Sequence, residues 1–250
     1  MHKDYFSAQS ADYKTFRPQY PQALFDFLCR DLNPHATVWD CATGNGQAAL
    51  ALQQYAAHVL ATDQSAAQLK HAGPHPKVHY IRAFAEAIPV ADHSIDMVTI
   101  AQALHWFDFD RFYAEVRRVV IPGGLIAAWT YSFLSVTDQL GNDIDSAIRW
   151  FYQDVIGPYW PPERRWVDEQ YRTIPFPFDE QPSPEISFDV MWDLSAILGY
   201  MSSWSAVQQY TAATREDPMP MLAKRLTPLW GEPETKRPLH WSLALRVGTV

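Results

Sequence analysis

The sequence is poor in basic residues, in cysteine and in long apolar runs. It has 20 Lys and Arg residues against 28 Asp and Glu residues, for a formal net charge of −8. Because nucleic-acid binding depends largely on Lys and Arg side chains that neutralise phosphates, we expect no nucleic-acid partner. No stretch reaches the roughly 18–20 apolar residues of a membrane span, and the first residues lack the apolar centre of a secretory signal. We therefore expect a cytoplasmic protein with no membrane partner.

The two cysteines, Cys29 and Cys41, occur without an export signal, so we predict that both are unpaired packing residues. The sequence also lacks a metal-binding pattern. His71 and His75 are four residues apart, but a Gly-Pro pair lies between them and breaks the helix that would bring both rings to one face. We therefore expect no bound metal.

Short apolar runs alternate with segments of helical periodicity through the first half of the chain. Such compact runs are typical of strands that are buried on both faces. We predict strands over residues 37–42, 58–63, 78–83, 95–102 and 125–131, helices over 47–56 and 66–72, and a helix that begins after Asp108 or Asp110 and is ended by Pro122-Gly123-Gly124. Repeated strand-helix-strand units predict a mostly parallel, doubly wound α/β sheet.

The second half is richer in proline and tryptophan. Residues 157–184 contain seven prolines, and seven of the ten tryptophans lie beyond residue 131. Residues 137–156 and 193–213 have the apolar spacing of helices, and residues 240–248 alternate as a last, antiparallel edge strand would. The aromatic residues either line a lid over an organic substrate or build a core between helices and sheet, and the core is the commoner use of each tryptophan.

The stretch VWDCATGNGQAAL, residues 38–50, has the form of a nucleotide-binding turn. Its glycines fit a relaxed dinucleotide pattern, and Asp63 follows at the end of the second predicted strand. The carboxylate of Asp40 is a poor neighbour for a pyrophosphate, but it suits the amino group and the sulfonium of S-adenosylmethionine. Asp63 suits the ribose of either ligand. The structural alternatives are that Asp40 is a turn residue and that Asp63 caps a helix.

Ala85-Glu86 follows the third predicted strand, and Gln102-Ala103-Leu104-His105-Trp106-Phe107 follows the fourth. Both segments lie at the carboxyl ends of strands, where ligands bind in an open α/β sheet. With these residues the sequence resembles the class I S-adenosylmethionine-dependent methyltransferases, and in particular the methyltransferase-11 type and its trans-aconitate- and cantharidin-methyltransferase-like branch. The resemblance covers residues 12–131 and reappears at residues 199–207. Its motifs are Asp40-x-Ala42-x-Gly44-x-Gly46, Asp63, Ala85-Glu86-x-x-Pro89, Ser94-x-Asp96-x-Val98 leading to Ala103-x-His105-Trp106, and Arg118-x-x-x-Pro122-Gly123-Gly124.

The resemblance implies a Rossmann-like, seven-stranded sheet with the last strand antiparallel, under a helical and aromatic cap. It also implies a set of cofactor contacts. Asp40, Ala42 and Gly44 would flank the methionine part, Asp63 would bind the ribose with Gln64 beside it, Ala85 and Glu86 would border the adenine, and Gln102 would lie beneath the ligand. Ala42 replaces the first glycine of the motif, which an ordinary backbone angle would allow.

Two residues after the fourth strand are candidates for catalysis. His105 is the best placed general base if the acceptor is a hydroxyl or an amine, and its alternative role is to pack and orient the loop. Trp106 could face the sulfonium or the substrate, or belong to the loop core. In the resembling proteins the segment that holds Tyr13, Arg17 and Tyr20 folds over the cofactor. Arg17 would pair with a carboxylate of a ligand or with an acidic residue of the surface.

The hypothesis is therefore an S-adenosylmethionine-dependent methyltransferase that acts on a small organic molecule, with a carboxylic acid as the favoured acceptor. A methyltransferase-like fold that binds without catalysis and a nicotinamide-dependent oxidoreductase are the alternatives. We expect one domain, with a cap segment at residues 1–30, a cofactor-binding core at 31–132, a substrate-side insertion and strand at 133–235 and a final strand at 236–250. Neither the acceptor nor the oligomeric state can be read from the sequence.

Overall fold

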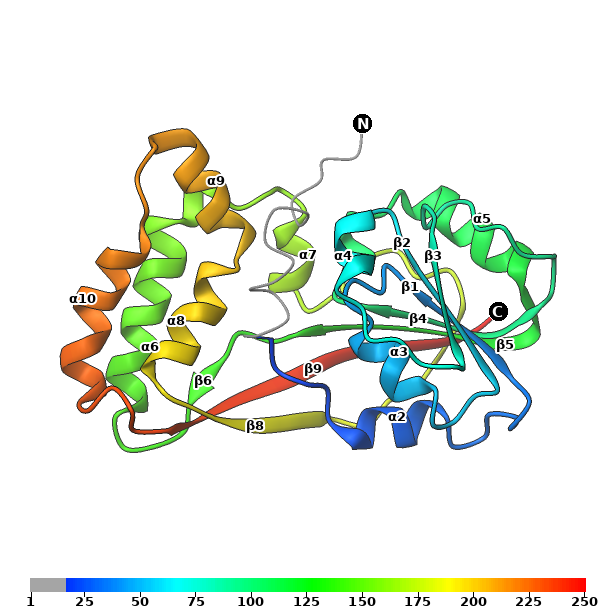
Figure 1. Cartoon of the computed structure of the whole chain (residues 1–250), viewed down its shortest axis with the longest axis horizontal. Helices are drawn as coiled ribbons and strands as arrows, with labels where there is room; N and C mark the ends of the chain where they lie inside the picture. Colours follow the sequence, from blue (N-terminus) through cyan, green and yellow to red (C-terminus); the bar gives the residue numbers. More distant parts are fainter. Residues whose placement is uncertain (1–16) are drawn as a thin grey trace.

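In the computed structural model, described here for residues 17–250, a nine-stranded sheet runs through the molecule (Figure 1). Five parallel strands stand in the order β3-β2-β1-β4-β5, and β9 continues the sheet antiparallel to β5. The strands are β1 (Thr37–Cys41), β2 (His58–Asp63), β3 (Val78–Arg82), β4 (Ile95–Ala101), β5 (Val120–Tyr131), β6 (Ser135–Val136), β7 (Asp179–Gln181), β8 (Ile186–Trp192) and β9 (Arg237–Thr249).

The order β3-β2-β1-β4-β5-β9-β8 is the predicted seven-stranded, mostly parallel sheet, so the fold class is confirmed. One detail was wrong. The last strand does not lie at the edge, because β5 and then β6 pair with one side of β9 while β7 and β8 pair with its other side. Alternation of side chains in a sequence cannot distinguish the two places, because both edge and inner strands alternate.

Four helices cover the two faces of the parallel strands: α2 (Gln22–Leu28), α3 (Gln47–Leu52), α4 (Ala66–Lys70) and α5 (Phe109–Val119). Consecutive residues of β1 point to opposite faces, as the period of a strand requires. Val38 belongs to a buried cluster with Leu24 of α2 and Leu52 of α3. Trp39 belongs to a second cluster, and its ring lies 6.1 Å from that of Phe112 of α5. The sheet is therefore covered on both sides, which explains the compact apolar runs.

The passage from α5 to β5 differs from the prediction. The helix is capped by Asp108, which accepts a hydrogen bond from the backbone of Arg111, and it ends at Val119. Pro122, Gly123 and Gly124 lie inside β5 and do not form a terminating loop. A Cβ on Gly124 would lie 2.8 Å from the carbonyl oxygen of Asp96, so glycine is needed for this close approach of two backbones.

Most helices of the second half form a group where β8 ends and β9 begins, whereas α7 (Arg164–Asp168) lies between this group and the parallel strands (Figure 1). Residues 137–156 become an α-helix that continues as a π-helix, and residues 193–213 become two helices separated at Ser203 and Trp204. The helix α10 was not predicted. These elements are α6 (Gly141–Trp150), η3 (Phe151–Val155), η4 (Gly157–Tyr159), α7 (Arg164–Asp168), α8 (Leu194–Ser202), α9 (Ser205–Thr214) and α10 (Met219–Trp230).

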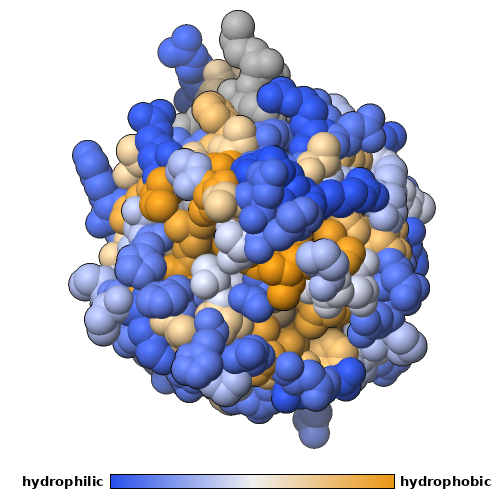
Figure 2. All heavy atoms as spheres, turned by 90° about the vertical axis from the view of Figure 1, so that its right-hand side faces the viewer, coloured by the Kyte–Doolittle hydropathy of each residue, from blue (hydrophilic) through white to orange (hydrophobic). Residues whose placement is uncertain are grey.

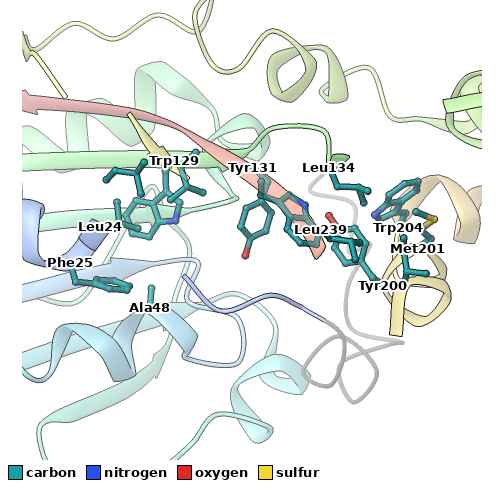
Figure 3. Packing of buried hydrophobic residues seen from close by; sticks show 14 of the residues in the cluster. Leu24, Phe25, Ala48, Trp129, Tyr131, Leu134, Tyr200, Met201, Trp204 and Leu239 are labelled. Carbon is teal, nitrogen blue, oxygen red and sulfur yellow. The ribbon is translucent and has the colours of Figure 1, made fainter. Parts of the chain in front are cut away.

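One buried cluster connects the sheet to this helical group. In Figure 3, Leu24, Phe25 and Trp129 lie at one end, Tyr131 lies in the middle, and Tyr200 and its neighbours lie at the other end. Both cysteines are buried and unpaired, as predicted. Among residues 17–250, no helix has both the length and the apolar character needed to cross a membrane.

Candidate functional site

The loop between β1 and α3 bends sharply at three residues with left-handed backbone. These are Ala42, Gly44 and Gly46, with φ of 55°, 58° and 84°. A Cβ on Gly46 would collide with the hydroxyl of Tyr80, so this position requires glycine on two grounds. The backbone angle of Ala42 is therefore not the ordinary one that would accommodate an alanine without strain. The rest of the turn imposes it, and the side chain reaches a cavity beside the loop.

Asp40 lies directly beneath this loop and is completely buried. Its carboxylate accepts hydrogen bonds from the hydroxyls of Thr43, at 2.5 Å, and Thr99, at 2.9 Å. Burial raises the pKa of this carboxyl to about 6, although the two hydroxyls work in the opposite direction. Asp40 therefore supports the loop from below, and it does not line the cavity beside the loop.

Asp63, at the end of β2, holds the same loop from the side. One of its carboxylate oxygens accepts from the backbone N–H of Gly44 at 2.9 Å, and the other accepts from that of Ser65 at 2.8 Å. Ser65 is the residue that caps α4, through a hydrogen bond that its side chain accepts from the backbone of Gln68. Each carboxylate oxygen has a second lone pair that can accept from another donor. Gln64 lies next to Asp63 and is exposed.

The segment after β3 forms one further side of this edge. Ala85 and Glu86 are half-buried within a tight turn closed by a bridge between Phe84 and Ala87. The ring of Phe84 is 55% exposed, which is unusual for so large an apolar side chain. Glu86 accepts a long hydrogen bond, 3.4 Å, from the backbone of Asp108.

A first cavity lies between the loop and the end of β4. Its walls are Arg17, Tyr20, Ala42, Thr43, Gly44, Asn45, Gln47, Ala48, Ala101, Gln102 and Tyr131. The side-chain amide nitrogen of Gln102 is buried here and makes no hydrogen bond with any residue in the range 17–250. Such a buried donor needs an acceptor, so it fits a ligand that brings one. With the bent backbone of the loop and the carboxylate of Asp63 beside it, this chemistry suits an amino acid attached to a nucleoside.

A second cavity of about 80 Å³ adjoins the first and shares Arg17, Gln102 and Tyr131 with it. Its other walls come from distant parts of the chain and are largely aromatic: His105, Trp106, Ser132, Phe133, Leu134, Trp160, Pro161, Arg164, Val167, Tyr200, Trp204 and Ser205. Trp160 and Trp204 line this cavity, whereas Trp230 and Trp241 are fully buried core residues. The tryptophans thus divide between the two predicted uses.

Arg164 is the one residue of α7 that brings a cation to this cavity. Its Nε donates to the hydroxyl of Tyr152 at 2.7 Å and to the carboxylate of Asp168 at 3.1 Å. The guanidinium lies over the ring of Trp160, 4.5 Å from the centroid. Its two terminal nitrogens donate to no residue that the structure describes, so they can donate to a ligand.

His105 and Trp106 lie in a short 3₁₀ turn, η2 (Leu104–Trp106), and both line the second cavity. His105 is only 8% exposed, and its Nδ1 is 2.8 Å from the hydroxyl of Tyr171. Burial, with a smaller effect of the Arg164 charge, lowers the pKa of His105 to about 3. The imidazole is therefore neutral at physiological pH, and it is a poor base.

The described part of the cap segment, residues 17–30, includes Arg17 and Tyr20. Tyr20 stacks on Tyr131 and meets Trp129 edge-on, both with ring centroids 5.5 Å apart, and Arg17 lies over the ring of Tyr200. Arg17 lines both cavities and Tyr20 lines the first one. Tyr13 lies outside the described residues.

Sequence reasoning did not find Tyr171, Thr130 or Arg164. Tyr171 and Thr130 are fully buried, and no local motif marks either one. Arg164 lies in the aromatic, proline-rich segment WPPERRW. A cation among apolar residues in that segment is the sequence feature that could have indicated a ligand-binding residue.

A larger hollow at the opposite end of the sheet is not the same kind of site. It is lined by Phe27, Ile121, Leu125, Val247 and nearby residues, at the end where the parallel strands begin. Figure 2 looks onto this side of the molecule, where hydrophobic residues reach the surface between hydrophilic ones. Ligands of doubly wound sheets bind at the carboxyl ends of the strands, where the two cavities lie.

Comparison with known proteins agrees with this geometry. The methyltransferase-11 family model, described as a methyltransferase domain, matches residues 39–128. A protein of Dictyostelium discoideum named as a methyltransferase is 31% identical over 227 residues, which are 89% of this chain and 85% of that protein. A solved structure from Anaeromyxobacter dehalogenans, described as a type II methyltransferase, is 40% identical and covers 94% of this chain and 98% of its own, with a TM-score of 0.83.

A Saccharomyces cerevisiae protein named as an S-adenosylmethionine-dependent methyltransferase is 28% identical over 132 residues, 49% of this chain and 45% of that protein. These relationships decide against the oxidoreductase and against a fold without catalysis. The chain belongs to the class I S-adenosylmethionine-dependent methyltransferases and carries the methyltransferase-11 domain.

Proposed function

We propose that this methyltransferase transfers the methyl group to a carboxylate oxygen of a small organic acid, which forms a methyl ester. The observation that carries the proposal is Arg164, which brings unpaired guanidinium nitrogens to the aromatic cavity next to the cofactor loop. A guanidinium matches the two oxygens of a carboxylate better than any other side chain does. The aromatic walls favour a partly apolar acid. Such a substrate agrees with the trans-aconitate-like branch suggested by the sequence.

The cofactor would occupy the first cavity. The backbone at Ala42 and Gly44 would approach its methionine part, and the carboxylate of Asp63, which holds the loop through Gly44, would accept hydrogen bonds from the ribose hydroxyls. Gln64, Ala85 and Glu86 would border the nucleoside. When bound, S-adenosylmethionine supplies an activated methyl group on a positively charged sulfur.

Asp40 would act on this cofactor through the loop, because it is completely buried beneath the loop and does not line the cavity. The amide nitrogen of Gln102 would donate to an acceptor atom at the floor of the cavity. Arg17 and Tyr20 would close the site from the amino-terminal side, since they reach the walls of the first cavity.

The chemistry of the second cavity favours an acid over a hydroxyl or an amine. A carboxylate is ionised at neutral pH and needs no base. Its oxygen forms a bond to the methyl carbon while the carbon–sulfur bond breaks and its electron pair remains on sulfur, so no proton moves. A hydroxyl or an amine would profit from a base, and His105, whose pKa is lowered to about 3, is ill suited to that task.

The protein contributes alignment and exclusion of water. Arg164 would hold the carboxylate, and the rings of Trp106, Trp160 and Trp204 would fix the apolar part of the substrate. Alignment of two bound reactants can supply several kcal/mol of the barrier, on the order of 7–11 in favourable cases. Transfer in a closed aromatic cavity also protects the activated methyl group from water.

The experiment is a panel of carboxylic acids, phenols and amines incubated with the full chain and S-adenosylmethionine carrying a labelled methyl group. Transfer to an acid gives an ester, which mild base hydrolyses to labelled methanol, whereas ethers and methylamines survive the same treatment. Base-labile label on an acid supports the proposal. Base-stable label on phenols or amines, with none on any acid, would overturn it.

A further inference from the structure

The side chain of Arg164 is held by a tyrosine that does not itself line the second cavity. We propose that Tyr152 is a positioning residue of the acceptor site: its hydroxyl holds Nε of Arg164, so that the two terminal nitrogens of the guanidinium bind the acceptor carboxylate. The inference deepens the proposed function and rests on it for the identity of the acceptor. Tyr152 acts through Arg164 and does not touch the substrate.

Tyr152 lies in η3, the π-helix that continues α6. The π-turn is closed by a hydrogen bond of 3.0 Å from the backbone N–H of Ile156 to the carbonyl of Phe151, five residues earlier. Such a turn contains one residue more than an α-turn, so it changes the direction of the side chains that follow α6, and single π-turns are frequent at functional sites. This irregular turn brings Tyr152 to α7, where Arg164 and Asp168 lie one helical turn apart.

Tyr152, Arg164 and Asp168 form a triangle of hydrogen bonds. Nε of Arg164 donates to the phenol oxygen at 2.7 Å and to Oδ1 of Asp168 at 3.1 Å, and the phenol donates to the same Oδ1 at 2.6 Å. A guanidinium only donates and a carboxylate only accepts, which fixes these directions. Burial raises the pKa of Tyr152, so the phenol keeps the proton that it donates. The single N–H of Nε is therefore used within the protein.

The triangle decides which edge of the guanidinium faces a ligand. A guanidinium is flat, and its donors point outward in fixed directions within its plane. Because Nε is bound to Tyr152 and Asp168, the donors that remain are the two terminal nitrogens, which match the two oxygens of one carboxylate. The guanidinium also lies over the ring of Trp160, with its carbon 4.5 Å from the centroid, which limits its movement. The carboxylate therefore meets a donor pair that is oriented before it binds.

Tyr152 also supports the aromatic wall of the cavity. Its backbone carbonyl accepts from Nε1 of Trp160 at 3.3 Å, and its ring lies 4.9 Å from the ring of Trp160 and 5.7 Å from that of Trp204. Both tryptophans line the cavity. Phenylalanine in place of Tyr152 keeps the ring and the carbonyl and removes only the hydroxyl. The Tyr152→Phe variant therefore separates the effect on Arg164 from the packing of the wall.

The first experiment observes Arg164 without a substrate. Proton–nitrogen NMR on the full chain with labelled arginine detects the Nε–H signals, and the Arg164→Gln variant identifies the signal of Arg164 by its absence. In the wild type this proton should exchange with water about tenfold more slowly than that of Arg165, the adjacent exposed residue. In Tyr152→Phe the exchange should become about tenfold faster, because only the bond to the half-exposed Asp168 remains.

The control is Tyr159→Phe, since Tyr159 lies in the neighbouring η4, packs against Tyr210 and does not line the cavity. An exchange rate of Arg164 that equals that of Arg165 in the wild type, or that Tyr152→Phe leaves unchanged, would overturn the inference.

Circular dichroism establishes that each variant is folded. If Tyr152→Phe is not folded, Asp168→Ala decides in its place. The hydroxyl of Tyr152 remains in that variant, so the exchange of the Arg164 proton should stay within about threefold of the wild type. A rise to the rate of Arg165 would show that Asp168 holds Arg164 without Tyr152, which contradicts the inference.

The second experiment is a double-mutant cycle on an acid that the panel shows to be methylated. Tyr152→Phe should lower kcat/KM about tenfold in the wild type but less than about twofold in the Arg164→Gln background, because the hydroxyl then has no guanidinium to hold. A purely structural role would give the same loss in both backgrounds, and that result would overturn the inference.

The inference and the proposed function fail in different ways. If an acid is methylated and the loss is the same in both backgrounds, the inference is wrong and the proposed function stands. If no acid is methylated, the proposed function is wrong, and the exchange of the Nε proton alone decides whether Tyr152 holds Arg164.

Discussion

The two cavities of this enzyme are built in different ways. The first is formed mainly by one continuous turn between β1 and α3, whose backbone angles give the cavity its shape. Asp40 and Asp63 hold this turn in place through hydrogen bonds. The second combines side chains from β5, from η2, from α7 and the loop before it, and from α8 and α9. A turn made of backbone needs glycine at fixed spacing and can be recognised locally. A cavity made of side chains can be assembled from many sequences.

The largest effect expected in the first region concerns the buried charge of Asp40. Its pKa is raised from 3.8 to about 6, so the folded state binds this proton more tightly than the unfolded state does. The stabilisation is complete below pH 3.8 and is lost as the pH rises to about 6. The difference of 2.2 pKa units corresponds to roughly 3 kcal/mol.

Asp40→Asn should remove this dependence. Urea unfolding at about pH 4 and about pH 7 should show the variant gaining stability relative to the wild type at the higher pH, by up to about 3 kcal/mol. Asp31→Asn, at an exposed position, is the control and should show no such change. An equal difference between wild type and Asp40→Asn at both pH values would mean that Asp40 is not held as a buried acid.

Asp63→Ala distinguishes the two cavities, because it should affect cofactor binding and leave the second cavity intact. Loss of two hydrogen bonds to a charged acceptor should weaken binding of S-adenosylhomocysteine about 100-fold. Titration calorimetry measures this change, with NADH as the control ligand and Asp31→Ala as the control variant. If the variant binds S-adenosylhomocysteine with an affinity within about threefold of the wild type, Asp63 does not bind the ribose.

Arg164→Gln tests the other region. Binding of S-adenosylhomocysteine should remain unchanged, while kcat/KM for an acid acceptor should fall about 30-fold, because a charge-assisted pair with the carboxylate is lost. Arg165→Gln is a closely matched control, since Arg165 is the adjacent exposed residue and does not line the cavity. Equal losses in the two variants would show that Arg164 has no special role.

The smallest effect is expected at Ala42. Glycine adopts a φ of 55° without the Cβ strain, so Ala42→Gly should raise the free energy of unfolding by up to about 1 kcal/mol. The control is Ala114→Gly, at an exposed position inside α5, which should lower it by about 1 kcal/mol. Chemical denaturation compares the two. A loss of stability in Ala42→Gly would show that the turn does not strain this alanine.

The sequence predicted the first region well and the second poorly, for physical reasons that individual residues make clear. The strands, Gly44, Gly46 and the cap Ser65 follow from local patterns. The angle of Ala42 does not, because the surrounding turn imposes it. Asp40 was expected beside the ligand, but its place beneath the loop depends on Thr99, which is 59 residues away in the chain.

By itself, the sequence determined the class of fold, the family and the glycine-containing turn after β1, because apolar periodicity and glycine spacing act over a few residues. Only the tertiary structure shows that Arg164 lines the same cavity as His105 and that Tyr171 contacts His105. It also shows that β9 is an inner strand of the sheet. These contacts join segments far apart in the chain. Their geometry depends on how the helical group packs against the sheet, and no local pattern encodes that packing.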